Sequence, residues 1–182
     1  MSDPKVILDK DAIQRSLTRI AHEISEANTD GDGVGLIGIQ RGGVHLADRL
    51  SDLLGGIWRC DVSVGLLDVS MHRDDISQRG IVRVQPTEVP FDVEGKTIVL
   101  VDDVLYTGRS VRAAIDALMN FGRPKNVEYL CLIDRRFSRE LPIQADYIGK
   151  SIDSIDSEKV IVSWKEKDSS DSVIMINPEK NE

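Results

Sequence analysis

The sequence predicts an α/β fold: a central parallel sheet flanked by helices, with a small hood and a flexible loop. The unbroken branched apolar run at residues 98–101, and a second mainly apolar segment at 127–133, have the composition of parallel strands covered on both faces. Segments of helical periodicity alternate with such runs, and short strands with acidic connections follow late in the chain. A length of 182 residues with 41% hydrophobic residues suits a single domain, residues 1–182, with one full core.

The first part of the chain is predicted to form a helix, a strand and a second helix. Residues 9–28 show the periodicity of an amphipathic helix. A short strand is expected at 35–39 and, after a turn at 40–43, a helix at about 44–54. Gly55 and Gly56 are expected to end that helix as a left-handed cap. The apolar stripe of the first helix consists of Ile13, Leu17, Ile20, Ile24 and Ala27.

The remaining elements follow from alternation and from helix-breaking residues. Residues 60–67 alternate enough for a strand, whereas 68–80 are polar and predict a mobile loop or hairpin tip. Strand character resumes at 81–84 until prolines interrupt it, and Gly122 and Pro124 end the helix that follows the run at 98–101. Three late strands are expected at 145–148, 160–164 and 172–176, and an appended hairpin or hood is expected in this part of the chain.

Residues 98–110, IVLVDDVLYTGRS, carry the clearest chemical pattern. Asp102 and Asp103 come where the predicted strand ends, and open α/β sheets bind ligands at that end of their strands. The following TGRS opens a helix, whose N–H groups, glycine and hydroxyls suit a phosphate. The segment therefore predicts a sugar-phosphate site. The alternative interpretation is a buried strand that ends in a solvated Asp–Asp turn, followed by an ordinary helix cap.

This segment resembles the signature of the type I phosphoribosyltransferases, which bind 5-phosphoribosyl-1-diphosphate (PRPP). The resemblance implies that Asp102 and Asp103 are the catalytic pair that holds the ribose hydroxyls, and that the turn from Tyr106 to Ser110 holds the 5′-phosphate. Mg²⁺ is expected as a cofactor carried with PRPP, with no direct set of protein ligands, because it pairs with diphosphate oxygens and keeps several waters. The residues expected to bind PRPP or the nucleotide are Val104, Leu105, Tyr106, Thr107, Gly108, Arg109 and Ser110.

The turn at 40–43 matches the position of the diphosphate loop in the resembled family. Its glycines let backbone N–H groups approach an anion, and Arg41 adds a planar set of donors, although a generic strand–turn–helix connection explains the spacing equally. Arg73 and Arg79, in the polar loop, are candidates for a lid over the diphosphate, with solvated loop charge as the alternative. The diphosphate loop consists of Gln40, Arg41, Gly42 and Gly43.

Further stretches, scattered from about Val6 to Val162, resemble the PyrR family, which combines regulation of pyrimidine genes with uracil phosphoribosyltransferase activity. They are KVILDKDAIQRSLTRIAHEI, VDDVLYTGRSVRAAIDAL, GRPKNV, RELPIQADYIGK and SEKV. The resemblance implies the reaction of uracil with PRPP to give UMP and diphosphate, and UMP-dependent binding of pyrimidine-operon leader RNA in transcription attenuation. It places the base pocket near Tyr106 and at Ile133, Asp134, Arg135 and Arg136.

The regulatory half of the resemblance depends on a basic RNA-binding face. The sequence departs from the family pattern at Gln144 and around residues 136–138, and a net charge of −8 requires that any such face be locally basic. A helix stripe of Arg and His also fits a solvated surface. Three functions therefore stay open: a transferase alone, an RNA-binding attenuator with the transferase site as its nucleotide sensor, and a transferase for another base. The RNA candidates are Thr18, Arg19, His22, Arg139 and Lys150.

Composition bears on location and partners. No stretch approaches the roughly 20 apolar residues that span a bilayer, and no secretory signal is evident, so no membrane partner is expected. Cys60 and Cys131 lie far apart without metal-ligand spacing, so we expect two buried thiols and a cytoplasmic protein. A homodimer or higher homo-oligomer is also expected.

Overall fold

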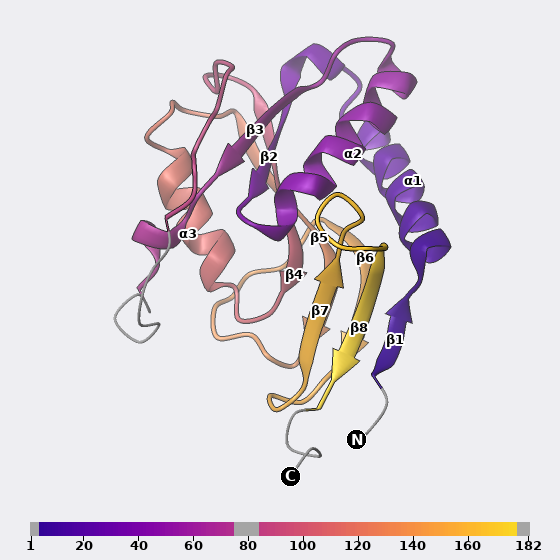
Figure 1. Cartoon of the computed structure of the whole chain (residues 1–182). Helices are drawn as coiled ribbons and strands as arrows, with labels where there is room; N and C mark the ends of the chain where they lie inside the picture. The colour runs from indigo at the N-terminus through magenta and orange to yellow at the C-terminus, as the bar shows by residue number, and fades with distance from the viewer. Residues whose placement is uncertain (1–3, 75–83, 178–182) are drawn as a thin grey trace.

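The computed structural model describes residues 4–74 and 84–177. Its centre is a five-stranded sheet in which every neighbouring pair is parallel, in the order β3-β2-β4-β5-β6 (Figure 1). With helices on both sides, this sheet confirms the predicted fold class. The strands are β2 (Val34–Ile39), β3 (Ser63–Leu67), β4 (Thr97–Leu105), β5 (Asn126–Arg136) and β6 (Tyr147–Asp153).

Two helices pack on one face of the sheet and one packs on the other (Figure 1). Along β4, Val99 and Val101 face the pair of helices, whereas Ile98 and Leu100 face the single helix. All four side chains are fully buried, which is why the run lacks polar residues. The pair of helices is α1 (Lys10–Ala27) and α2 (Gly42–Trp58), and the single helix is α3 (Arg109–Leu118).

The first helix begins and ends close to its predicted bounds. The Asp9 carboxylate caps it by accepting a hydrogen bond of 2.7 Å from the Ala12 N–H. Ile13, Leu17, Ile20 and Ile24 are fully buried as predicted. Ala27 is the exception, because it is exposed in the last turn of α1.

The predicted end of the second helix is wrong. Gly55 and Gly56 lie inside α2, and the left-handed residue that ends the helix is Arg59, with φ 58°. The extra turn carries Trp58 onto the core, where its ring lies 2.8 Å from the position a Cβ of Gly31 would occupy. Packing of the indole thus overrides the weak helix propensity of two glycines.

The acidic pair lies within a strand and not after it. On the side of β2, the pairing of β4 ends at Val101, whereas on the side of β5 it continues to Leu105. Asp102 and Asp103 therefore extend past the end of β2 while β5 still holds them in register. This arrangement leaves one edge of the pair open to the loop that follows β2.

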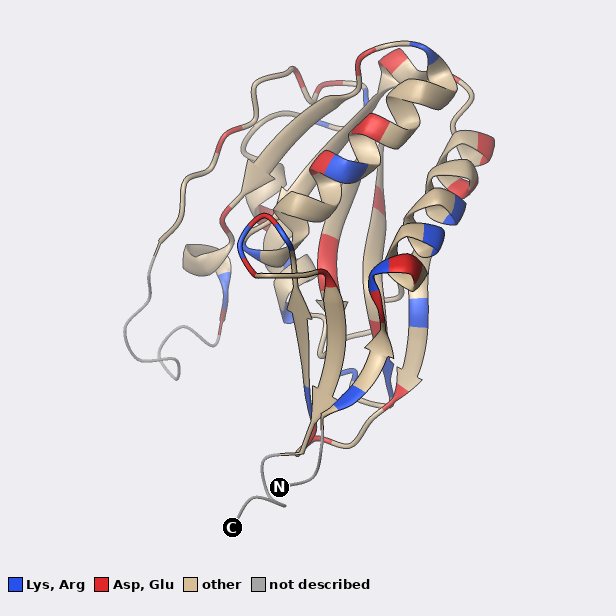
Figure 2. Ribbon diagram, turned by 45° about the vertical axis from the view of Figure 1, so that its right-hand side comes forward, with Lys and Arg blue, Asp and Glu red and all other residues tan. Residues whose placement is uncertain are grey.

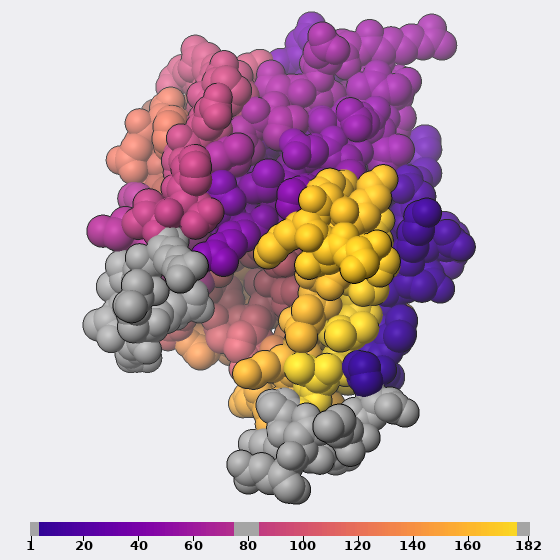
Figure 3. Space-filling view, viewed as in Figure 1, coloured from indigo at the N-terminus to yellow at the C-terminus, as the bar shows by residue number. Residues whose placement is uncertain are grey.

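The second sheet is antiparallel, in the order β1-β8-β7, and we call it the hood. Its hairpin, β7 (Lys159–Ser163) and β8 (Ser172–Ile176), was predicted, but β1 (Lys5–Leu8) was not. Figure 3 shows the surface hollowed between the hood and the body of the molecule.

The other differences concern element boundaries. The strand expected from Cys60 begins at Ser63, and that expected at 145–148 runs from Tyr147 to Asp153. Val84 lies outside any strand, and the rest of the strand predicted at 81–84 lies outside the described residues. Short 3₁₀ turns form at Gly31–Gly33 (η1) and Ser70–His72 (η2). Both cysteines are free thiols, and no helix among the described residues is long and apolar enough to cross a membrane.

Candidate active site

Two cavities open beside the ends of β2, β4 and β5, and the acidic pair lies between them. The first has a volume of about 620 Å³ and includes Asp102 in its lining; the second, of about 510 Å³, includes Asp103. Successive side chains of a strand point to opposite sides, which accounts for this division. All seven residues predicted to bind the nucleotide, 104–110, line the first cavity.

Residues 106–110, which we call the phosphate turn, connect β4 to α3. Gly108 has φ 93°, a left-handed conformation that favours glycine, and it precedes the first residue of α3. No side chain caps this helix start, and Thr107 Oγ1 accepts only a long bond of 3.4 Å from the Arg109 N–H. The start of α3 thus presents backbone N–H groups at the cavity, as an anion site requires.

Ionisation is disfavoured for both carboxyl groups of the acidic pair. Burial raises the pKa of Asp102 well above its ordinary value, and the neighbouring Asp103 carboxylate adds to the increase. Burial also raises the pKa of Asp103. The Tyr129 hydroxyl lies 3.5 Å from Asp102 Oδ2, and the Asp103 N–H donates to Asp102 Oδ1 at 3.0 Å. A ligand that offers hydroxyls or positive charge would therefore favour the ionised pair.

The diphosphate loop borders the second cavity. Gln40, Arg41 and Gly42 line it, and the Gln40–Arg41 peptide bond is cis. A Cβ on Gly42 would lie 1.8 Å from Asp103 Oδ2, and one on Gly43 would lie 2.0 Å from the Val101 carbonyl oxygen. The two glycines therefore allow the loop to reach the acidic strand, which no residue with a side chain would permit.

One of the two lid candidates reaches the first cavity. Arg73 lines it and donates a hydrogen bond to Ser110 Oγ, whereas Arg79 lies outside the described residues. The neighbouring Asp74 forms an ion pair with Arg109, which also pairs with Glu140 at 2.6 Å. These acidic side chains hold the Arg109 guanidinium at the mouth of the phosphate turn, and their hydrogen bonds raise its pKa.

Of the four residues predicted for the base pocket, Arg135 alone lines the first cavity, and none lines the second. Its guanidinium lies 4.1 Å from the centre of the Tyr106 ring. Ile133 is fully buried in the core and Arg136 forms an exposed ion pair with Asp153, so neither side chain reaches the cavity. Asp134 also stays outside the cavity lining, bound by Arg139.

The five RNA candidates do not share one environment. Thr18 and Arg19 lie on α1, where Thr18 donates to the Gln14 carbonyl and Arg19 donates to the Ile148 and Gly149 carbonyls at 2.8 Å. His22 is exposed on the same helix, and Lys150 donates to the Ile7 carbonyl. Arg139 instead binds carbonyls at the ends of β4 and β5. Along α1, two arginines lie between acidic side chains that are nearer the two ends of the helix (Figure 2).

Several residues of the two cavities escaped the sequence analysis. Tyr129 lies inside a predicted strand, where its polar role gives no local signal, and Glu140 lies in the connection between β5 and β6. The hood contributes Val162, Trp164, Lys167 and Asp168 to the second cavity. Among residues 4–74 and 84–177, no group of three or more His, Cys, Asp or Glu side chains is arranged to hold a metal ion.

Comparisons with known proteins bear on both fold and family. Residues 5–168 match the phosphoribosyl transferase domain family. The chain is 51% identical over 173 residues to the Bifunctional protein PyrR of Pelotomaculum thermopropionicum, covering 93% of this chain and 94% of that one. It is 45% identical to the protein of the same name from Chloroflexus aurantiacus over the whole of both chains. The hypoxanthine phosphoribosyltransferase of Trypanosoma cruzi superposes with a TM-score of 0.76 at 20% identity, covering 98% of this chain and 97% of that one, a likeness of fold.

Proposed function

Because this chain belongs to the PyrR family of proteins with a phosphoribosyl transferase domain, we propose that it transfers the phosphoribosyl group of PRPP to uracil, releasing diphosphate and forming UMP. The observation that carries this proposal is the acidic pair between two cavities, one at a phosphate turn and the other at a glycine loop. That order matches the substrate, in which the ribose lies between a 5′-phosphate and a 1-diphosphate.

The reaction breaks the C1–O bond of PRPP, which develops positive charge on the ribose and negative charge on the diphosphate. Asp102 and Asp103 would accept hydrogen bonds from the ribose 2′ and 3′ hydroxyls and place negative charge near the forming cation. The phosphate turn would fix the other end of the sugar, and Arg41 would bind the leaving group. The protein thus acts by positioning and electrostatics, without a covalent nucleophile.

The residues present fit a Mg²⁺ ion that arrives on the diphosphate. Asp103 offers a carboxylate beside Gly42 in the cavity proposed for the diphosphate, and carboxylate oxygen is the ligand type that Mg²⁺ prefers. When bound, the ion would neutralise charge on the departing diphosphate. Asp103 would then orient the ribose and the ion together. Burial raises the pKa of Asp103, so a cation beside it would stabilise the ionised carboxylate.

The test of this proposal is uracil-dependent release of diphosphate from PRPP. A panel of bases run in parallel decides base identity, because backbone groups near Arg135 would read the edge of the base and side chains there say little about it. Release of diphosphate with uracil, and with no other base of the panel, supports the proposal. Release with a purine and none with uracil would make the protein a transferase for another base.

We propose regulation by leader RNA as the second activity, supported by membership of a family whose curated members carry the name bifunctional. On this chain, Arg15, Arg19 and Lys150 border a groove of about 320 Å³ between α1 and β6. Filter binding to the pyrimidine leader of the source organism, with and without UMP, tests the activity. Binding that UMP strengthens supports it, and absence of specific binding at low salt would leave a transferase alone.

A further inference from the structure

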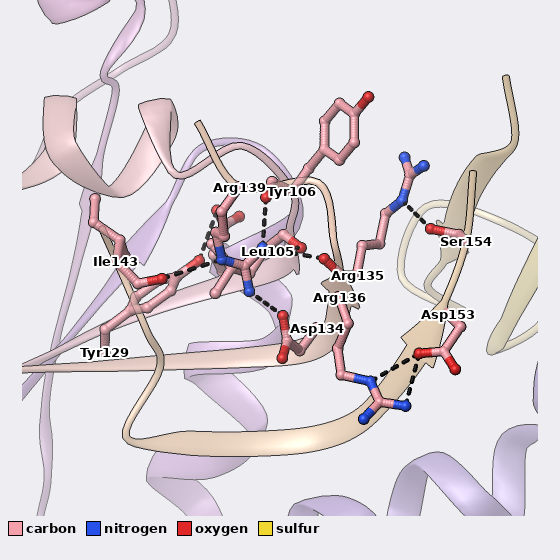
Figure 4. Close-up of polar contacts among 11 residues, drawn as sticks. Leu105, Tyr106, Tyr129, Asp134, Arg135, Arg136, Arg139, Ile143, Asp153 and Ser154 are labelled. Carbon is pink, nitrogen blue, oxygen red and sulfur yellow. Dashed lines mark hydrogen bonds and ion pairs between the residues drawn. The ribbon is translucent and has the colours of Figure 1, made fainter. Parts of the chain in front are cut away.

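We propose that Arg139 is a positioning residue that fixes the phosphate turn by binding the ends of β4 and β5 together, an inference that rests on the proposed transferase function. Arg139 lies in the connection between β5 and β6 and does not line either cavity at the acidic pair. Its guanidinium is directed inward, between the two strand ends (Figure 4).

The side chain contacts four backbone carbonyls and one carboxylate. Nε donates to the Ile143 carbonyl at 3.1 Å, and Nη1 lies 3.4 Å and 3.2 Å from the carbonyls of Leu105 and Arg135. Nη1 also donates to the Tyr106 carbonyl, and Nη2 pairs with the Asp134 carboxylate. Each of the three guanidinium nitrogens therefore has at least one acceptor.

The position of these carbonyls explains why an arginine is needed. The pairing of β4 with β5 ends at Leu105 and Asp134, so the two strands no longer bond to each other beyond these residues, while β5 goes on pairing with β6 as far as Arg136. Arg139 is only 23% exposed, and buried carbonyls without a donor are costly. A planar fork of five N–H groups satisfies several of them at once and sets the distance between the two strand ends.

The residues that follow Arg139 bind the phosphate turn directly. The N–H groups of Glu140 and Leu141 both donate to the Thr107 carbonyl, at 3.1 and 3.2 Å. The side chains of Leu141 and Ile143 lie 3.3–3.5 Å from where a Cβ of Gly108 would be. The turn is therefore held at its start by Arg139 and along its back by the segment that Arg139 anchors.

This geometry distinguishes a positioning role from an RNA contact. An arginine that binds RNA presents its guanidinium to solvent, whereas Arg139 directs its donors at the protein's own backbone. Lysine at this position keeps the charge but has a single ammonium that cannot span the same acceptors. Arg139→Lys should therefore loosen the turn while leaving the net charge unchanged.

The experiment compares the full-length chain with its Arg139→Lys and Arg123→Lys variants. Arg123 is exposed in the connection between α3 and β5 and serves as the matched control. Amide hydrogen exchange is followed at residues 106–110, and calorimetry measures UMP binding. We expect faster exchange at the turn, and UMP affinity and kcat/KM for PRPP that fall on the order of tenfold to a hundredfold, in Arg139→Lys alone.

Two results would overturn the proposal. One is wild-type exchange at the turn together with UMP affinity within about twofold of wild type. The other is loss of leader-RNA binding with nucleotide binding intact, which would assign Arg139 to RNA. If Arg139→Lys does not fold, Asp134→Asn, which removes only the anionic partner, should give a smaller change in the same direction, and no change would count against the proposal. An inactive wild-type chain would refute the transferase function, whereas the exchange measurement would still decide the anchoring.

Discussion

Gly42→Ala is the sharpest test of the proposed approach between the diphosphate loop and the acidic strand. A methyl group at this position would lie 1.8 Å from Asp103 Oδ2 and 2.2 Å from its Cγ, where ordinary contact begins at 3.4 Å. Either the loop or the carboxylate must therefore move by roughly 1.6 Å. The loop has little room to retreat, because Gly43 already lies against the Val101 carbonyl of β4.

The expected effect falls on catalysis more than on stability. When a group that positions the sugar is displaced by about 1 Å, the rate falls on the order of a hundredfold. The kcat/KM for PRPP should therefore fall by at least about that factor. Crowding of a packed contact costs about 1–3 kcal/mol of unfolding free energy, which the chain should survive because Asp103 can shift toward the open cavity.

The measurement combines diphosphate-release kinetics with urea denaturation. Gly56→Ala is the matched control, since Gly56 lies in the same helix and a Cβ there would meet nothing within 4 Å. The control should keep its kcat/KM and gain about 0.5–1 kcal/mol in stability, as expected for alanine in a helix. Near-wild-type kcat/KM for Gly42→Ala in a folded protein would refute the proposed closeness of loop and acidic pair.

Three further perturbations test other parts of the molecule. Asp103→Asn should reduce turnover by orders of magnitude yet stabilise the fold near neutral pH. Because the pKa of Asp103 is raised in the folded protein, ionising this carboxyl opposes folding, and wild-type stability falls as pH rises through that pKa. Denaturation at several pH values should therefore show a flatter pH dependence of stability in the variant. Arg49→Met should cost about 3 kcal/mol of unfolding free energy because it leaves the buried Asp171 carboxylate without its arginine partner. Hydrogen bonds from Arg49 lower the pKa of Asp171 and Glu166, so the stability they confer is lost as pH falls through those lowered values, and urea titrations should show a weaker acid dependence in Arg49→Met. If α1 binds leader RNA, Arg19→Gln should reduce the slope of log affinity against log salt by about one while transferase kinetics stay unchanged, and an unaltered slope would exclude Arg19 from the phosphate contacts.

The parts of the fold that the sequence predicted are those whose composition is imposed locally. The run 98–101 is fully buried and has the branched composition typical of a strand covered on both faces, and α1 shows its periodicity over five turns. By contrast, β1 is four residues long with Val6 62% exposed, and it becomes a strand only because β8 pairs with it. The extension of α2 past Gly55 likewise depends on a remote contact, that of Trp58 with Gly31.

The same distinction applies to the site. Residues 104–110 are contiguous, so one motif located them together at one cavity. Tyr129 and Trp164 join the cavities from other elements, and nothing in their own surroundings in the sequence indicates this. For Arg139, the sequence showed a basic residue in a polar segment, but only the structure shows that its donors face backbone carbonyls at strand ends.

The pairing of the first strand with the last has a consequence for synthesis on the ribosome. Lys5 pairs with Met175, so β1 has no partner until synthesis has passed residue 175, a wait of about 10–35 seconds at usual elongation rates. The strands that bear the acidic pair and the phosphate turn all precede Asp153 and emerge well before β8. A nascent chain should therefore form its phosphate turn before its hood, and the N-terminal segment, with apolar Val6 and Ile7, remains without its sheet during that interval.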